Sequence, residues 1–146
     1  MAHEFDGQKH EKDSAHQQAW GERLVAELDL KGSERVLDLG CGDGRVTAKL
    51  AALVPDGEVV GIDASRGMLE VARGKTGPNL SFRLLDIDDL DYEDASDVIF
   101  SNATLHWILD HPRFLLYMRR AFRHLIRVVK ETMALPAFCA QFASFR

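Results

Sequence analysis

The segment Val36-Leu37-Asp38-Leu39-Gly40-Cys41-Gly42-Asp43-Gly44 decides the fold of this 146-residue chain. An apolar run ends at Leu39, glycines occupy three alternate positions after it, and a helical pattern then begins. Glycine permits a positive φ and lets a ligand approach the main chain closely. A strand, a glycine-rich turn and a helix N-terminus form the nucleotide-binding corner of doubly wound α/β folds, so we expect such a corner here.

A second apolar run, residues 59–62, ends in Asp63. An acidic residue about 20 residues beyond a glycine-rich loop can accept hydrogen bonds from the ribose hydroxyls of a bound nucleoside. The loop and Asp63 together predict an adenosine-containing ligand. The alternative is that Asp63 only stabilises the turn that follows its strand.

Two features of the loop separate the classes of adenosine ligand. Dinucleotide-binding loops have the spacing G-x-G-x-x-G, with the pyrophosphate at the helix N-terminus. Here the third glycine, Gly44, comes one residue sooner, and Asp38 and Asp43 bring negative charge that would repel a pyrophosphate. S-adenosylmethionine has no phosphate, and its amino and sulfonium groups are positive. The loop therefore favours S-adenosylmethionine over NAD.

Hydrophobic periodicity and turn residues predict alternating strands and helices. Strands are expected near 35–39, 58–62, 80–85 and 96–101, and helices near 15–29, 44–53 and 66–73. Asp13 or Ser14 would cap the first helix. Such alternation indicates a parallel sheet with right-handed crossovers.

Two of these helices have a clear apolar face. In the first helix the expected inward residues are Trp20, Leu24, Val25 and Leu28. In the second they are Val46, Leu50 and Leu53. These faces would pack against the sheet.

The segment 38–44 resembles the first motif of class I S-adenosylmethionine-dependent methyltransferases. Three later segments resemble the next motifs in order: Gly61-Ile62-Asp63-Ala64-Ser65, Leu84-Leu85-Asp86-Ile87-Asp88, and residues 97–107. The last segment is most similar to small-molecule methyltransferases of the trans-aconitate and malonyl-carrier-protein type. The resemblance covers roughly residues 14–118 and implies a Rossmann-like, doubly wound α/β sheet with strand order 3-2-1-4.

The resemblance also implies a cofactor site for S-adenosylmethionine and its product S-adenosylhomocysteine. Its expected residues are Asp38, Gly40, Cys41, Gly42, Asp63, Ala64, Met68, Asp86, Ile87 and Asn102. Asp63 would hold the ribose, Asp86 with Ile87 the adenine, and Asp38 the loop and the ligand amino group. The alternatives are turn-stabilising carboxylates and, for Met68, a core methionine.

Residues outside the cofactor set could act on the acceptor. His106 could be a general base, because its ordinary pKa suits proton removal near neutrality. Alternatively it only forms hydrogen bonds within its loop. Trp107 could contact the sulfonium or pack in the core, and Gln17 and Trp20 on the first helix could close over the ligand. Cys41 is expected to contribute its backbone and not a nucleophile, and no metal site is expected.

Composition indicates a cytosolic globular chain. Hydrophobic residues make up 46% of it, and no apolar run approaches the roughly 20 residues of a membrane span. Two cysteines are too few for a disulfide scaffold. The net charge of −5 conceals a basic stretch after His111, which could bind nucleic acid or simply neutralise its own domain. The stretch lacks a recognisable nucleic-acid motif, so we expect no nucleic-acid partner.

The pattern changes after Asp110. An apolar stripe predicts a long helix over 112–134, ended by Pro136, where the resembled family continues with a fifth strand and two more. The chain is therefore expected to be one shortened domain, 1–146, with a flexible start (1–13) and a helical tail (112–146). The fourth strand would become an edge, covered by the helix or by a second copy of the chain.

These observations predict S-adenosylmethionine-dependent methyl transfer to a carboxylate or hydroxyl oxygen of a small-molecule acceptor. Two alternatives remain open at this point. One is a cofactor-binding remnant or minimal domain without catalysis. The other is a basic-tailed adaptor that binds nucleic acid or a protein.

Overall fold

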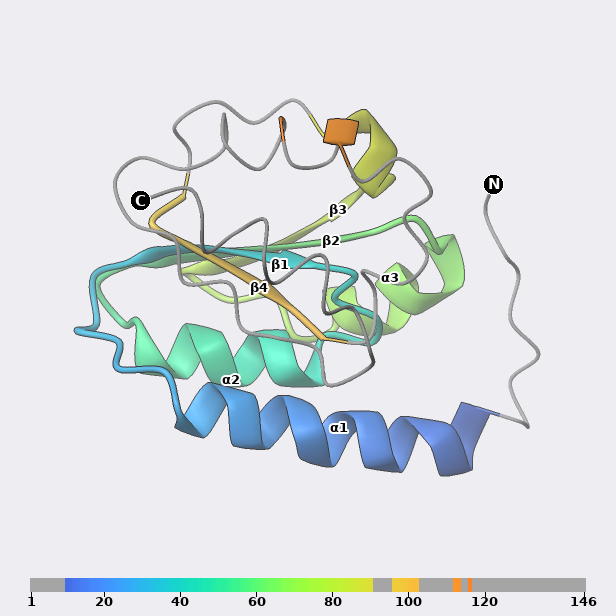
Figure 1. Ribbon diagram of the computed structural model, residues 1–146, viewed down its shortest axis with the longest axis horizontal. Helices are drawn as coiled ribbons and strands as arrows, with labels where there is room; N and C mark the ends of the chain where they lie inside the picture. Colours follow the sequence, from blue (N-terminus) through green and yellow to red (C-terminus); the bar gives the residue numbers. More distant parts are fainter. Residues whose placement is uncertain (1–9, 91–95, 103–111, 114–115, 117–146) are drawn as a thin grey trace.

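The computed structural model describes residues 10–90, 96–102, 112–113 and 116 (Figure 1). Four parallel strands form one sheet in the order β3-β2-β1-β4. The strands are β1 (Arg35–Leu39), β2 (Glu58–Asp63), β3 (Leu80–Leu84) and β4 (Val98–Ser101). This order confirms the predicted Rossmann-like arrangement, and each strand lies within two residues of its expected bounds.

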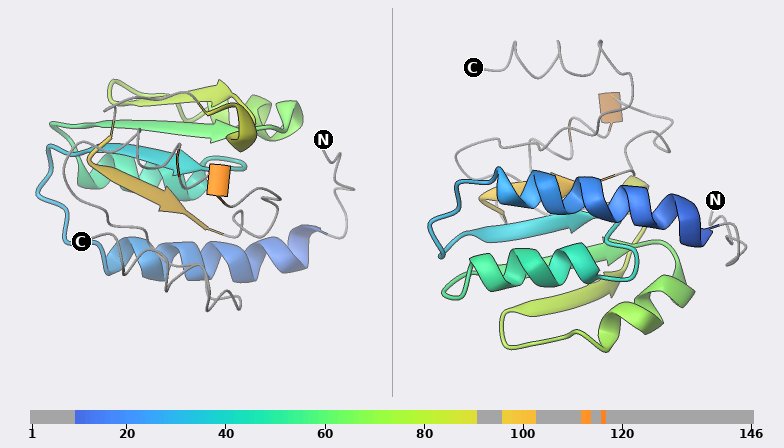
Figure 2. Two further views of the ribbon diagram at one scale, coloured as in Figure 1. Left: turned by 45° about the horizontal axis from the view of Figure 1, so that its top comes forward. Right: turned by 90° about the horizontal axis from the view of Figure 1, so that it is seen from below.

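Helices connect the strands in the alternating pattern that the sequence indicates. They are α1 (His10–Ala26), α2 (Arg45–Leu53), α3 (Arg66–Arg73) and the short 3-10 helix η1 (Ile87–Asp89). Figures 1 and 2 show α1, α2 and α3 on one face of the sheet. In Figure 1, η1 (olive) lies on the opposite face of the sheet. A right-handed crossover from β3 to β4 passes over that face, because β4 is added on the other side of β1 from β2 and β3.

Both faces of the central strands are buried. Val36, Val98 and Phe100 belong to the core that packs under α1 and α2, and Leu50 of α2 lies in the same cluster. The alternate residues of β1 point to the opposite face, and Leu37 and Leu39 are also buried there. Burial on two sides explains why β1 reads as a continuous apolar run interrupted only by Asp38.

Three local predictions are wrong. α1 begins at His10, so Asp13 and Ser14 lie inside the helix and cannot be its cap. Trp20 is 44% exposed and lies beside Arg23, with the guanidinium 5.6 Å from the ring centroid. Leu53 is 42% exposed because it ends α2, where Val54 turns inward and becomes the buried residue.

The long C-terminal helix predicted over 112–134 falls almost wholly outside the described residues, although residues 112, 113 and 116 are helical. Within the described strands, β4 pairs with β1 on one side. Whether a helix or a second copy covers its other side stays a prediction. In the part of the chain that the structure describes, we find no helix with the length and apolarity needed to cross a bilayer.

Candidate functional site

The glycine-rich loop leaves β1 at the carboxyl edge of the sheet, beside the end of β4, where Leu39 is paired with Ser101. Gly40, Gly42 and Gly44 have φ values of 70°, 55° and 77°, a region that side chains disfavour. Open α/β sheets bind ligands at this edge, where neighbouring crossovers leave in opposite directions. The alternate glycines are therefore required by the backbone path of the loop.

Hydrogen bonds to β2 fix the loop in place. The N–H groups of Gly40 and Cys41 both donate to the carbonyl oxygen of Ile62, at 2.8 and 2.9 Å. The N–H of Gly44 donates to the carbonyl of Cys41 at 3.0 Å and closes the turn that begins α2. The loop is thus a defined backbone structure and not merely a flexible connection.

Asp63 joins the loop to the start of α3. Its Oδ2 accepts a hydrogen bond from the N–H of Gly42 at 2.9 Å, and its Oδ1 accepts one from the N–H of Ser65 at 2.8 Å. The turn-stabilising role is therefore real. These two hydrogen bonds leave a lone pair unused on each oxygen, so the carboxylate can accept further hydrogen bonds from a ligand.

Asp38 is fully buried beneath the loop. Its Oδ2 accepts a hydrogen bond from the hydroxyl of Thr47 at 2.7 Å. Burial raises the pKa of Asp38 to about 7; the Thr47 bond opposes that rise and the negative charge of Asp63 adds to it. The acid at the end of β1 is thus held to α2 through Thr47, and burial favours its neutral form more than in an ordinary aspartate.

Cys41 is buried against Leu69, Ala72 and Phe82. Burial raises the pKa of its thiol far above the ordinary value, and the charges of Asp38 and Asp63 raise it further. The thiolate is the nucleophilic form of cysteine, so a thiol held protonated is inert. This agrees with the expectation that Cys41 is not a nucleophile.

The loop is packed on its underside and open on its outer side. A Cβ added at Gly44 would lie 2.7 Å from Cζ of Phe82, and one added at Gly61 would lie 2.8 Å from Cδ1 of the same ring. At Gly42, by contrast, no described atom comes within 4 Å of that position. The main chain at Gly42 is thus bare on one side, with the Asp63 carboxylate hydrogen-bonded beside it, which suits the close approach of a nucleoside ligand.

Sequence reasoning missed two residues that build this site, Thr47 and Phe82. Each had a usable signal. Thr47 is a polar residue on the inward face of α2, where it can meet a buried acid such as Asp38. Phe82 is paired in register with Gly61, a large residue beside one without a side chain.

The remaining predicted cofactor residues also lie at the carboxyl edge. Ala64 is exposed, Met68 and Ile87 are half-buried, and all three follow β2 or β3 directly or within one turn. The Oδ1 of Asp86 accepts from the N–H of Asp88 at 3.0 Å and caps η1. The N–H of Leu85 donates to the carbonyl of Asp63 at 3.0 Å, which brings the ends of β2 and β3 together.

Asn102 follows β4 and connects the site to α1. Its Nδ2 donates to the carbonyl oxygen of Gln17 at 2.8 Å. Its backbone stands at the end of the strand next to β1, as the prediction requires. His106 and Trp107 lie outside the described residues, so the structure places neither of them.

The charge of the loop differs from the expectation in one respect. The carboxylate of Asp43 is paired with the guanidinium of Arg45, whose Nε lies 2.9 Å from Oδ2. Lys75 donates from Nζ to the carbonyl of Asp43 at 2.9 Å. The negative charge of Asp43 is therefore compensated, contrary to the view that it stands free to repel a pyrophosphate.

Metal chemistry has no candidate site in the described ranges. No group of three or more His, Cys, Asp or Glu side chains there could hold a metal ion. What the arrangement offers is main chain at Gly42 that a ligand can approach closely, a carboxylate at Asp63 and half-buried apolar side chains.

Comparison with known proteins agrees with this geometry. The family model described as "Methyltransferase domain" matches residues 36–131. The chain is 45% identical over 92 residues to a trans-aconitate 2-methyltransferase of Methylobacterium radiotolerans, covering 63% of this chain and 35% of the relative. It is 37% identical over 107 residues to a malonyl-[acyl-carrier protein] O-methyltransferase of Bacillus anthracis, covering 70% and 39%.

A solved structure gives the same result. The chain superposes on an S-adenosylmethionine-dependent methyltransferase from Mesorhizobium loti with a TM-score of 0.60 and 30% identity. The match covers 69% of this chain and 47% of that one. The chain thus spans little more than a third of the length of the curated relatives it matches.

Proposed function

The chain belongs to the class I S-adenosylmethionine-dependent methyltransferases, and from this premise we propose that it binds S-adenosylmethionine and methylates an oxygen of a small molecule. One observation carries the proposal: the Gly42 N–H donates to Asp63 at 2.9 Å, while no described atom lies within 4 Å of the Cβ position of Gly42. That pairing places a carboxylate with spare lone pairs beside bare backbone, as a ribose-binding site requires.

The binding roles follow from where each residue stands. Asp63 accepts the ribose hydroxyls, and Asp86 with Ile87 borders the adenine at the end of β3. Gly40 and Gly42 admit the ligand to the main chain, and Asp38 holds that main chain from below through Thr47. Ala64, Met68, Cys41 and Asn102 complete the border of the site, Cys41 through its backbone.

When bound, S-adenosylmethionine supplies an electrophilic methyl group on a sulfonium, and S-adenosylhomocysteine remains after transfer. The contribution of the chain is alignment of two bound molecules and exclusion of water. A carboxylate acceptor needs no proton removal. A hydroxyl acceptor needs a base, and His106 is our candidate for that step.

The acceptor class is part of the proposal. Relatives named for trans-aconitate and malonyl-carrier-protein methylation favour a carboxylate oxygen. The rival candidate is a cofactor-binding domain without catalysis, which is favoured by the fraction of the relatives that the chain spans. The two differ in whether the bound ligand turns over.

Calorimetric titration of the 146-residue chain with S-adenosylhomocysteine tests the binding proposal. We expect micromolar binding, weakened at least tenfold by Asp63→Asn, which retains one acceptor oxygen but loses the charge. The matched control is Asp88→Asn, an exposed acid at the same edge, and it should bind as the wild type does. Absence of binding by a folded wild-type chain would refute the proposal, and equal binding by both variants would refute the role of Asp63.

Transfer is tested separately with radiolabelled S-adenosylmethionine and trans-aconitate or a malonyl thioester. Acid-stable label in the acceptor supports the enzyme. Binding without transfer to either acceptor supports the non-catalytic domain instead.

A further inference from the structure

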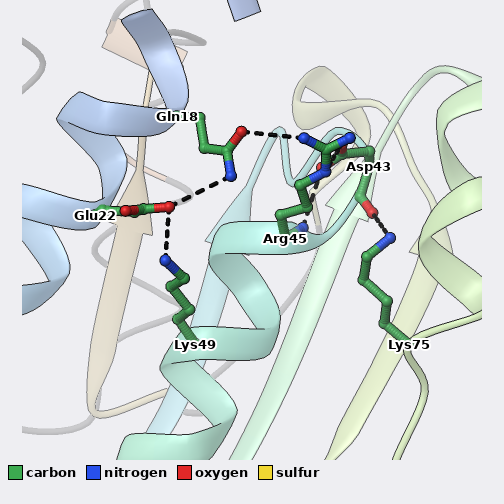
Figure 3. Close-up of polar contacts among 6 residues, drawn as sticks. All are labelled: Gln18, Glu22, Asp43, Arg45, Lys49 and Lys75. Atoms are coloured by element: carbon green, nitrogen blue, oxygen red, sulfur yellow. Dashed lines mark hydrogen bonds and ion pairs between the residues drawn. The ribbon is translucent and has the colours of Figure 1, made fainter. Parts of the chain in front are cut away.

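A continuous chain of polar contacts joins the glycine-rich loop to helix α1 (Figure 3). It starts at Lys75 after α3, passes through the loop and the first turn of α2, and ends between α1 and α2. Its members are Lys75, Asp43, Arg45, Gln18, Glu22 and Lys49. Segments far apart in the sequence are thereby connected by side chains and by the backbone carbonyl of Asp43.

Arg45 is the junction of this chain. Its Nε lies 2.9 Å from Oδ2 of Asp43, its backbone N–H donates to Oδ1 of Asp43 at 3.1 Å, and its Nη1 donates to Oε1 of Gln18 at 3.1 Å. One guanidinium therefore holds the loop with one nitrogen and α1 with another. A planar fork can direct a separate nitrogen at each partner, whereas a lysine ammonium is a compact point charge without that fixed geometry.

The position of Arg45 is otherwise unfavourable. It is the first residue of α2, and no acidic residue occupies that first turn. A cation at a helix N-terminus opposes the helix dipole. The stability of α2 thus gives no reason for an arginine here, and its contacts with Asp43 and Gln18 give one.

The contact of Arg45 with α1 is at Gln18, which precedes the part of the helix whose side chains pack in the core. Leu24 and Val25 pack in the hydrophobic core, whereas Gln18 and Glu22 make polar contacts. The helix continues from there toward His10, beyond the carboxyl end of β1 (Figure 1). Its N-terminal half therefore stands at the edge that carries the candidate site.

At Gly21, helix α1 lies very close to α2 and to the residue that follows β4. Gly21 is buried in the middle of the helix, and a Cβ there would lie 2.8 Å from Nδ2 of Asn102 and 2.9 Å from Cγ2 of Val46. Glycine costs helix stability, so its use at this position indicates that proximity is needed. α1, α2 and the end of β4 meet at this point.

We propose that Arg45 is a positioning residue that couples the glycine-rich loop to helix α1. Asp43 is held from both sides, by Arg45 on its carboxylate and by Lys75 on its carbonyl, so a shift of the loop displaces Arg45 and with it Gln18. Ordering of one element then orders the other. Insofar as the loop binds S-adenosylmethionine, which rests on the function proposed above, ligand binding also orders residues 17–22 of α1.

Amide hydrogen exchange on the unliganded chain tests the coupling directly. The variant Arg45→Lys retains the positive charge beside Asp43 but removes the two-sided grip. The matched control Lys49→Met breaks the contact of α1 with α2 through Glu22 and leaves the loop untouched. We expect Arg45→Lys to speed exchange about two- to fivefold both at 40–44 and at 17–22, the range of an exposed ion pair. Lys49→Met should speed exchange at 17–22 only.

A second readout uses S-adenosylhomocysteine as the probe. Binding should protect residues 17–22 in the wild type and in Lys49→Met but not in Arg45→Lys, whose Kd should rise about two- to fivefold. Equal exchange patterns for the two variants, or an effect of Arg45→Lys confined to α1, would overturn the coupling. If the wild type binds no ligand, the function proposed above fails, and the unliganded comparison still decides the coupling.

Discussion

The two edges of the sheet have the same kinds of residue and use them differently. Each edge has a glycine with positive φ, Gly32 at the amino edge and Gly42 at the carboxyl edge, and each has acids whose oxygens accept backbone hydrogen bonds. At the amino edge, the acids bond to neighbouring backbone and Gly57 has no room for a side chain. At the carboxyl edge, the main chain of Gly42 has no described atom within 4 Å of its Cβ position, and the half-buried carboxylate of Asp63 lies beside it.

At the amino edge, the hydrogen bonds of the acids hold turns and strands together. The carboxylate of Glu34 accepts from the N–H groups of Lys31 and Gly32, at 2.6 and 2.9 Å. Asp97 accepts from the N–H of Arg35 at 2.8 Å and ties β4 to β1. Gly57 lies directly against the backbone carbonyl of Glu34, with no room for a Cβ.

At the carboxyl edge, the position of Gly42 is open and the Asp63 beside it is only partly buried. The comparison shows that glycines and acids at a strand end do not by themselves mark a ligand site. What distinguishes the candidate site is space: no described atom lies within 4 Å of the Cβ position of Gly42, whereas Gly57 has no room for a Cβ. Each prediction below changes one edge and leaves the other intact.

The largest expected effect concerns the buried acid of the carboxyl edge. A pKa of about 7 for Asp38, against 3.8 for an ordinary aspartate, means that the folded state binds more protons than the unfolded state between these values. Stability from this group is therefore present at acid pH and is lost as the pH rises through that window. The full difference corresponds to about 4 kcal/mol.

The variant Asp38→Asn removes this titration but can still accept from Thr47. We expect its free energy of unfolding, relative to wild type, to rise by up to about 4 kcal/mol between pH 4 and pH 8. Urea unfolding at four pH values measures the difference. A difference that stays constant with pH would mean that Asp38 is not buried as a protonated acid.

Closure of the amino edge predicts the second effect. In Gly57→Ala the new methyl group would meet the backbone of Glu34, which cannot rotate away as a side chain could. We expect a loss of about 3 kcal/mol in the free energy of unfolding. Gly67→Ala is a matched control, since no described atom lies within 4 Å of its Cβ position and its φ is not in the left-handed region. Similar losses in both variants would contradict the closed edge.

Much of this comparison could be predicted from the sequence. The apolar runs and turn residues predicted the strands and helices, because these signals are local and repeat with the period of the elements. The glycine loop and Asp63 pointed to the edge of the candidate site, whereas the strand order came from the family resemblance. The partners of the acids could not be read in this way. Arg45 compensates Asp43 from two residues away, whereas Thr47 meets Asp38 only after the crossover folds back.

Errors in the elements have a similar origin. Ser14 has the chemistry of a cap, but a cap acts only where the helix begins, and α1 extends four residues further to His10. Trp20 falls on an apolar stripe, but its side chain is 44% exposed, and the α1 side chains that pack in the core are Leu24 and Val25. A local pattern thus identifies residues suited to a cap or a core face, but not where the helix begins or which of its residues the core covers.

The open position at Gly42 predicts a smaller effect on stability with a larger one on binding. Gly42→Ala meets no described atom, so its cost is the strain of a side chain at φ 55°, about 1 to 2 kcal/mol. The new methyl group would occupy the space proposed for the ligand, and we expect binding of S-adenosylhomocysteine to weaken at least tenfold. Thermal unfolding measures the loss of stability, and calorimetric titration measures the loss of affinity. Unchanged affinity would show that the ligand does not approach Gly42.

The smallest effect belongs to the acid of the amino edge, and its pH dependence has the opposite sign to that of Asp38. Partial burial raises the pKa of Glu34, but hydrogen bonds from neighbouring backbone N–H groups outweigh burial and hold the pKa below its ordinary value. Stability from this group is therefore present above the ordinary pKa and is lost as the pH falls.

Glu34→Gln tests that sign. Gln replaces one acceptor oxygen with an NH₂ group facing a backbone N–H, so we expect a loss of less than about 1 kcal/mol at pH 7, because the group is partly exposed. The loss should shrink toward pH 3, where the wild-type carboxyl is also protonated. Opposite pH trends in Asp38→Asn and Glu34→Gln would establish that one edge buries its acid from solvent while the other uses it to hold a turn. Parallel trends would mean that the two edges do not differ in the way their geometry implies.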